Sequence, residues 1–199
     1  SYLSRQPDFV GPSPGAGVEV MALQITDDYG LVLAAAGAIG MTQLFLGGGV
    51  MGLRKKFFKD NRAFLSKPEV EAMAEKHKKA FGGDMNDMGY PDMGCGLYAQ
   101  QLDYEQWVEL NNAQRAHYNM VESSGPVLAC MLATGLRFPK VCGSFGFMFA
   151  LARFLYAQGY KSKKGADGRM VGAVLGAVAS LGLFGTSLVT GGLIFAQRK

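Results

Sequence analysis

The sequence predicts an all-α integral membrane protein, a bundle of four transmembrane helices with a long polar loop between the first two. The chain is 49% hydrophobic and only 18% charged, whereas about a quarter of the residues in a typical soluble domain are charged. Its 28 glycines match the frequent use of glycine in membrane helices. Long uncharged stretches alternate with charged segments, as expected for helices that cross a bilayer.

The first predicted transmembrane helix follows an N-terminal tail. Residues 1–26 are rich in proline and glycine and predict an extended, irregular tail. No charged residue lies between Tyr29 and Leu53, and a basic cluster begins at Arg54. Because about 20 apolar residues cross the bilayer core, we expect a helix over about 29–53 that ends at this cluster.

A polar insertion, residues 58–110, separates the first two predicted transmembrane helices. Within it, 67–80 begins with acidic residues and ends with basic ones, which suits the helix dipole and predicts a short surface helix. The stretch 82–96 shows no periodicity and predicts a loop. A helical pattern resumes at Tyr104 and continues into the membrane.

The remaining transmembrane helices are expected over about 115–136, 141–160 and 170–196. With the first, they form a membrane domain over 27–199. Even-numbered topology places the insertion and the connection near residue 165 on one side of the membrane. Both segments carry clustered Lys and Arg, so the positive-inside rule favours that side as the cytosolic one or its equivalent.

Two polar stripes begin or end these helices on the insertion's side. Arg115, Asn119 and Glu122 follow at i, i+4 and i+7, which is one face of a helix. Arg153 and Tyr160 bracket a second such stripe, with a tyrosine between them. The cations, carboxylate and phenols together would suit a small zwitterionic, peptide-like anion.

An alternative interpretation needs no ligand. Cations at helix ends often extend toward water, tyrosines populate the aromatic belt of the membrane interface, and Glu122 would pair with Arg115 or Arg153. An acid near the mouth of a membrane helix nevertheless indicates function by default. Both interpretations remain open from the residues alone.

Other classes of site find little support. The net charge of +4 comes without a basic tract, so nucleic acid is not an expected partner. The chain has two histidines and three cysteines without close spacing, which predicts neither a metal centre nor a disulfide framework.

Two motifs resemble the MAPEG family, the membrane-associated proteins in eicosanoid and glutathione metabolism. The first is Gln-Arg-Ala-His-x-Asn-x-x-Glu over 114–122, and the second is Ala-Arg-Phe-Leu-Tyr-Ala-Gln-Gly-Tyr over 152–160. The residues after the first predicted helix, 53–57, are also similar. The resemblance covers about 27–57 and 110–197.

This resemblance implies a homotrimer of four-helix subunits that binds glutathione between neighbouring subunits. The implied glutathione-binding residues are Arg54, Arg115, His117, Asn119, Glu122, Arg153, Tyr156, Gln158 and Tyr160. The family carries an arginine after its third helix that stabilises the thiolate. Asp167 stands near that place and Arg169 is the nearest arginine, so Arg169 and Tyr156 are the catalytic candidates. Ser123 also departs from the family pattern, as do the tail and the insertion.

The sequence thus supports two main hypotheses of different class. The first is a glutathione transferase or peroxidase that acts on lipophilic substrates in the endoplasmic reticulum or in a mitochondrial or plastid membrane. The second is a structural accessory subunit of a large respiratory or photosynthetic membrane complex, docked through the tail and the insertion. A pigment- or lipid-binding module is a third, with His117 as its single candidate ligand.

Overall fold

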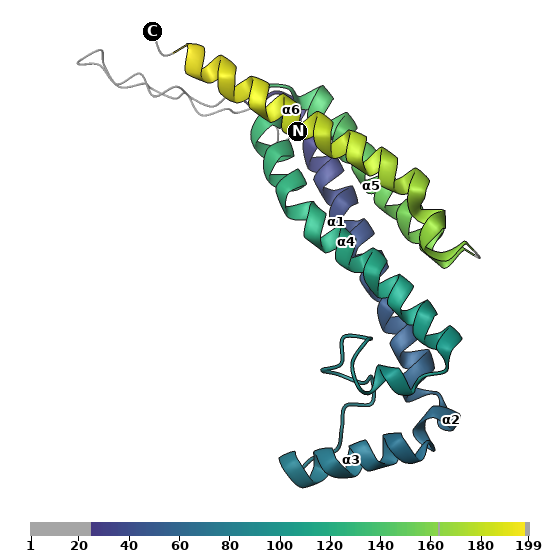
Figure 1. Ribbon diagram of the computed structural model, residues 1–199. Helices are drawn as coiled ribbons and strands as arrows, with labels where there is room; N and C mark the ends of the chain where they lie inside the picture. Colours follow the sequence, from purple (N-terminus) through teal and green to yellow (C-terminus); the bar gives the residue numbers. More distant parts are fainter. Residues whose placement is uncertain (1–24, 163, 198–199) are drawn as a thin grey trace, which may run out of the picture.

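The computed structural model describes residues 25–162 and 164–197. This part of the chain consists of helices joined by turns and loops (Figure 1). The prediction of an all-helical chain is confirmed for these residues, which contain no β-strand. The tail predicted over 1–26 lies outside the described residues except at its end.

Four long helices pack side by side: α1 (Tyr29–Arg54), α4 (Tyr104–Gly135), α5 (Pro139–Lys161) and α6 (Met170–Ala196). A short 3-10 helix, η3 (Gly165–Arg169), joins α5 to α6. The hairpin of α5 and α6 ends partway along the molecule, whereas α1 and α4 continue past it as a pair (Figure 1). The insertion is therefore attached beyond the end of the bundle.

Glycines bring α5 and α6 unusually close together at the end of their hairpin. A Cβ atom at Gly172 would lie 2.5 Å from Cα of Tyr156, and one at Gly159 would lie 2.5 Å from the carbonyl carbon of Gly168. No side chain fits at such distances, so the two backbones pack directly against each other. This contact sets how the end of α5 faces the start of α6.

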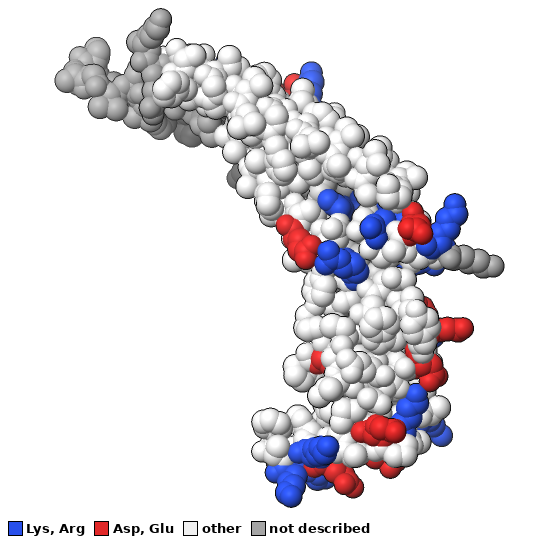
Figure 2. Space-filling view, viewed as in Figure 1, with Lys and Arg blue, Asp and Glu red and all other residues white. Residues whose placement is uncertain are grey.

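Within the described residues, three helical segments are long and apolar enough to cross a membrane: Tyr29–Lys59, Pro139–Lys161 and Gly165–Ala196. The second predicted transmembrane stretch, 115–136, lies in α4, which is not among the three. The first half of α4 carries many polar side chains and lowers its hydropathy. Figure 2 shows the consequence on one face: the bundle is nearly free of charge, and charged side chains gather where it narrows and on the insertion.

The insertion is a folded unit with its own apolar core. A π-helical turn, η1 (Lys55–Lys59), continues α1 and leads to α2 (Arg62–Leu65), α3 (Pro68–Phe81) and the 3-10 turn η2 (Ala99–Gln101). The predicted surface helix is thereby confirmed as α3. In the core, the ring of Phe64 lies 5.4 Å from that of Phe58 and 4.9 Å from that of Tyr98, centroid to centroid. All three side chains are buried.

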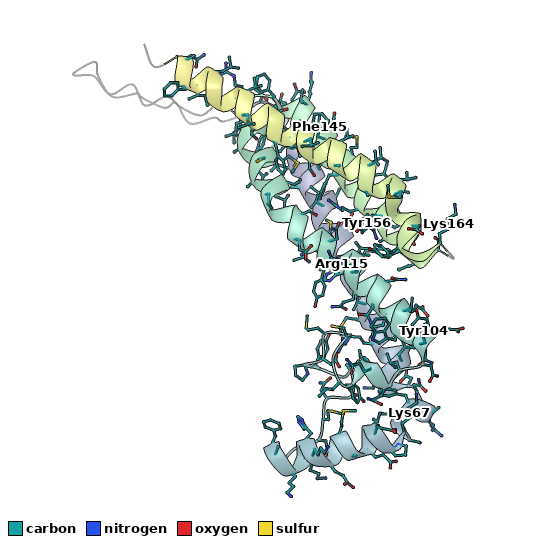
Figure 3. The ribbon with its side chains drawn as sticks, in the orientation of Figure 1. Lys67, Tyr104, Arg115, Phe145, Tyr156 and Lys164 are labelled. Atoms are coloured by element: carbon teal, nitrogen blue, oxygen red, sulfur yellow. The ribbon has the colours of Figure 1, made fainter. Side chains whose placement is uncertain are left out.

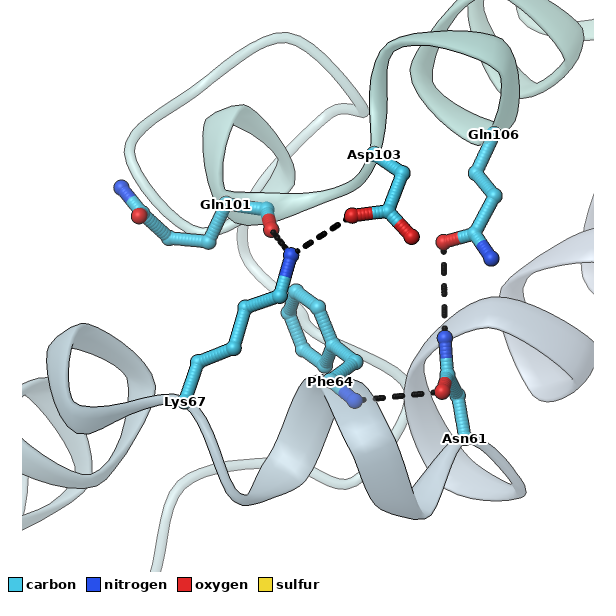
Figure 4. A network of polar contacts seen from close by, with 6 residues as sticks. All are labelled: Asn61, Phe64, Lys67, Gln101, Asp103 and Gln106. Carbon is cyan, nitrogen blue, oxygen red and sulfur yellow. Dashed lines mark hydrogen bonds and ion pairs between the residues drawn. The ribbon is translucent and has the colours of Figure 1, made fainter.

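Polar contacts attach this unit to the start of α4 (Figure 4). The Nζ atom of Lys67 donates to the carbonyl of Gln101 at 2.7 Å and to the carboxylate of Asp103 at 2.9 Å. Asn61 caps α2 by accepting from the backbone N–H of Phe64 at 3.1 Å, and its amide nitrogen donates to Gln106 at 3.4 Å. These bonds join the first part of the insertion to its last part and to the start of α4.

The loop between α3 and η2 is organised by the carboxylate of Asp92. Its two oxygens accept backbone hydrogen bonds of 2.7–2.9 Å from the N–H groups of Gly94, Gly96, Tyr98 and Ala99. Burial by itself raises the pKa of Asp92, but these four bonds together outweigh it and hold the pKa below its ordinary value. The charged carboxylate therefore stabilises the loop.

Candidate functional site

The polar stripe on α4 faces outward in a single chain. Nη1 of Arg115 lies 3.6 Å from Oε1 of Glu122, and the two side chains are 57% and 59% exposed. Ion pairs as exposed as this one contribute only about 0–1 kcal/mol to stability. The pairing of Glu122 with Arg115, one of the expected alternatives, is present but weak enough for a ligand to replace it.

A partly buried arginine of α5 lies beside this stripe. Arg153 of α5 donates from Nη1 to the side-chain oxygen of Asn119, and its guanidinium stacks on Phe149 at 4.7 Å from the ring centroid. Its Nε atom is buried and has no hydrogen-bond partner. Within the described part of the chain, no carboxylate lies within ion-pair distance of Arg153. Buried charges are normally paired, so this arrangement favours an anionic ligand.

The end of the α5–α6 hairpin adds two phenols and another cation. Nη1 of Arg169 donates to the hydroxyl of Tyr160 at 3.0 Å, and the rings of Tyr156 and Tyr160 meet edge to face at 5.2 Å. Both tyrosines are buried. Arg115 and Arg169 each interact electrostatically with Tyr156, and Figure 3 shows Arg115 and Tyr156 close together where the bundle narrows.

The structure brings together most of the predicted site residues: Arg115, Asn119, Glu122, Arg153, Tyr156, Tyr160 and Arg169. It places three others elsewhere. Arg54, the last residue of α1, is buried against the insertion, and Gln158 is exposed on α5. His117 lies on another side of α4, where a Cβ at Gly47 of α1 would be 3.2 Å from its Nε2.

A cavity of about 730 Å³ continues from this site toward the insertion. It arises because α1 and α4 extend past the end of α5. Besides Tyr160, its lining consists of Gly49, Leu53, Tyr104, Glu105, Val108, Glu109, Asn112, Lys161 and Ser162. Sequence analysis missed Glu105, Glu109 and Asn112 as site residues. Their spacing of three or four residues from one another and from Arg115 was the available signal, because it continues the same helical face.

The side chains of this site are chemically suited to bind carboxylates and to stabilise a thiolate. Three guanidinium groups, one carboxylate, one amide and two phenols are within reach of a ligand of peptide size. Forked guanidinium donors suit carboxylates, and a cation beside a phenol favours a thiolate over a thiol. No group of His, Cys, Asp or Glu side chains in the described residues is arranged to hold a metal ion.

Fold and site together define a class of protein: a helical membrane protein with a cationic site at the end of its α5–α6 hairpin. A comparison with protein families makes the assignment particular. The model of the MAPEG family matches residues 32–189, and the chain belongs to this family. No solved structure matches the chain. At the level of the family, it is an integral membrane protein of glutathione-transferase type.

Proposed function

We propose that the protein binds glutathione at the site between α4, α5 and η3 and uses the thiol against lipophilic substrates. The observation that carries this proposal is Arg153, a guanidinium with a buried, unpaired Nε and no carboxylate partner among the described residues. Glutathione offers two carboxylates, one ammonium group and one thiol. Each has a complementary group within the site.

The binding roles follow from the contacts. Arg115 and Arg153 would hold the two carboxylates, Glu122 would accept the ammonium group, and the amide of Asn119 would bond the peptide backbone. Binding replaces the exposed ion pair of Arg115 and Glu122, which costs little. The nearby cavity of about 730 Å³ lies within the size range of ligand sites and would admit the second substrate.

Arg169 and the two tyrosines would activate the thiol. Arg169 departs from the family's spacing, yet its guanidinium reaches the hydroxyl of Tyr160. Together with Tyr156, it would stabilise the thiolate and lower the pKa of the glutathione thiol. In transfer, the thiolate sulfur forms a bond to an electrophilic carbon, and the leaving group departs with the electrons of the broken bond. In peroxide reduction, two glutathione molecules become a disulfide, and the hydroperoxide becomes an alcohol and water.

The finer assignments are part of the same proposal. The motif spacing favours a protein most like microsomal glutathione S-transferase 3, with α4 as the fourth transmembrane helix and a homotrimeric assembly. The exposed stripe on α4 would then face a neighbouring subunit. Arg54, His117 and Gln158 would take part only through such a neighbour. An endoplasmic reticulum or organelle membrane is the expected location.

The test uses the full chain in lipid nanodiscs. We expect glutathione to bind in calorimetry and to support conjugation of 1-chloro-2,4-dinitrobenzene or reduction of a fatty-acid hydroperoxide. Arg153→Leu should weaken glutathione binding by about tenfold or more, because a hydrogen bond to a charged group is lost. Arg169→Leu should lower turnover more than binding. Arg62→Leu, at an exposed arginine of α2, is the matched control. Absence of glutathione binding by the unmodified chain would refute the proposal.

A second candidate function is a structural accessory subunit of a respiratory or photosynthetic membrane complex. The folded insertion favours it, because large apolar side chains are exposed there: Phe81 is 77% exposed and Leu97 is 75% exposed. Such side chains often mark protein interfaces. Extraction of the native membrane in mild detergent decides the matter. Recovery as a free trimer would exclude this function, and recovery only within a larger particle would support it.

A further inference from the structure

The cavity of about 730 Å³ is lined by opposite charges that do not meet. Glu105 and Glu109 of α4 contribute two carboxylates to its wall, and Lys161, the last residue of α5, contributes an ammonium group. Neither glutamate lies within ion-pair distance of Lys161. The cavity therefore separates two negative charges from one positive charge.

These three charges are open to a ligand. Within the described residues, no opposite charge lies within ion-pair distance of Glu105 or of Lys161. Glu109 is 3.8 Å from Nζ of Lys56, which is too long for a hydrogen bond, and both side chains are more than half exposed. Nζ of Lys161 lies beside α1 instead, where a Cβ atom at Gly49 would be 3.6 Å away.

The cavity lies at the level where two membrane-capable segments end and begin. Pro139–Lys161 and Gly165–Ala196 are both long and apolar enough to cross a membrane. The hairpin between them borders the cavity, and Figure 3 shows the lining residue Tyr104 beyond the end of this hairpin at Lys164. Lipid headgroups lie just outside such segments, because the hydrocarbon core accounts for about 30 Å of a bilayer about 40–45 Å thick.

A ligand with a cation at one end and an anion at the other would complement both walls. An anion without a cation would place negative charge near Glu105 and Glu109, and a cation alone would leave Lys161 without a partner. A primary ammonium group suits the two carboxylates best, because it donates up to three hydrogen bonds. A quaternary ammonium group donates none.

We propose that this cavity binds the headgroup of a phospholipid with a primary ammonium group, as in phosphatidylethanolamine. The ammonium group lies toward Glu105 and Glu109, the phosphate lies toward Lys161, and the glycerol contacts the apolar lining residues Leu53 and Val108. A lipid is favoured over a free headgroup because the cavity is at the membrane surface and part of its lining is apolar.

This inference does not depend on the proposed glutathione site. The headgroup is small compared with about 730 Å³, so the part of the cavity near Asn112 and Tyr160 stays open to the second substrate of the proposed function. Glutathione is titrated separately by calorimetry, so failure of one site is distinguishable from failure of the other.

The experiment titrates lipids onto the full chain in mild detergent and measures bound lipid by native mass spectrometry. Phosphatidylethanolamine is compared with phosphatidylcholine, which lacks ammonium donors, and with phosphatidylglycerol, which lacks the ammonium group, all with identical acyl chains. We expect phosphatidylethanolamine to bind at least about fivefold more tightly than either, as for a charge-assisted hydrogen bond that solvent weakens. Water-soluble phosphoethanolamine should bind at least about tenfold more weakly than the lipid, because it lacks the apolar contacts.

Two variants at exposed positions make the test specific. Glu105→Gln should weaken binding of phosphatidylethanolamine by about threefold or more and leave phosphatidylglycerol unchanged. Lys161→Gln should weaken all three lipids alike, because each carries the phosphate. Glu75→Gln and Lys79→Gln, at exposed positions of α3, are the matched controls and should change nothing.

Four results would overturn the proposal. They are binding of phosphatidylcholine or phosphatidylglycerol as tight as that of phosphatidylethanolamine, an unchanged preference among the lipids in Glu105→Gln, unchanged affinity in Lys161→Gln, and binding of soluble phosphoethanolamine as tight as that of the lipid. Tm of each variant without lipid shows that the chain is folded.

Discussion

Removal of the guanidinium of Arg54 is expected to unfold the insertion loop locally while the bundle remains intact. Arg54→Leu deprives the carbonyls of Met88 and Asp92 of their donors. Each charge-assisted bond contributes about 1.5–3 kcal/mol, and the contact with the ring of Tyr90 adds up to about 2 kcal/mol. Relief of the buried charge offsets part of this sum. We expect a net local destabilisation of about 3–5 kcal/mol.

Hydrogen exchange measured by mass spectrometry is the appropriate assay, because it reports local opening. In Arg54→Leu, peptides from residues 84–100 should exchange about a hundredfold faster or more, since about 1.4 kcal/mol corresponds to a factor of ten. Peptides from α6 should be unchanged. Arg54→Lys should give an intermediate effect, because one ammonium group lacks the fork that reaches both carbonyls. Unchanged exchange over 84–100 in Arg54→Leu, with Arg62→Leu as the control, would refute the role of Arg54 as the anchor of this loop.

Three further predictions concern the insertion and the helix contact. The pKa of Asp92 in the folded chain lies below its ordinary value. Asp92 therefore stabilises the loop above about pH 4, and this stabilisation is lost as the pH falls further. Hydrogen exchange of residues 84–100 should become faster through this acid transition, and Asp92→Asn should make the exchange less dependent on pH. Gly172→Ala should lower Tm by the equivalent of about 1–3 kcal/mol, because the new Cβ meets the backbone of Tyr156, whereas Gly191→Ala, which meets nothing within 4 Å, should not lower it. Phe64→Ala should cost about 3–5 kcal/mol and release the insertion core, seen as faster exchange of α2 and α3 but not of α5.

The helices were accessible from the sequence because hydropathy and helical periodicity are local properties. The uncharged run before Arg54 predicted α1, and the acid-to-base order over 67–80 predicted α3. The spacing of Arg115, Asn119 and Glu122 was sufficient to assign them to one face of a helix. The motif on the third predicted transmembrane helix, now α5, likewise indicated Arg153, Tyr156 and Tyr160 as site residues.

The fate of Arg54 was not accessible in this way. By position it resembles the basic residue that ends a membrane helix, and the family resemblance implied a role in glutathione binding. In the structure, Arg54 donates hydrogen bonds to the carbonyls of Met88 and Asp92, which lie 34 and 38 positions further along the chain. Which carbonyls meet a given guanidinium depends on how a loop folds back. No short-range pattern encodes that. The same holds for Gln114, because the residues packed around it decide whether its buried side-chain oxygen has a hydrogen-bond partner.

The sequence by itself determined an apolar, helical, membrane-embedded chain with polar stripes on two of its helices, because composition and spacing suffice for these properties. The tertiary structure alone decided which polar groups meet. Direct backbone contact between α5 and α6 at Gly172 brings Arg169 to the hydroxyl of Tyr160, although its spacing in the chain departs from the family's. The fold of the insertion, in turn, buries Arg54 against the loop that precedes η2. Both outcomes depend on contacts between segments distant in sequence, where close packing selects the partners.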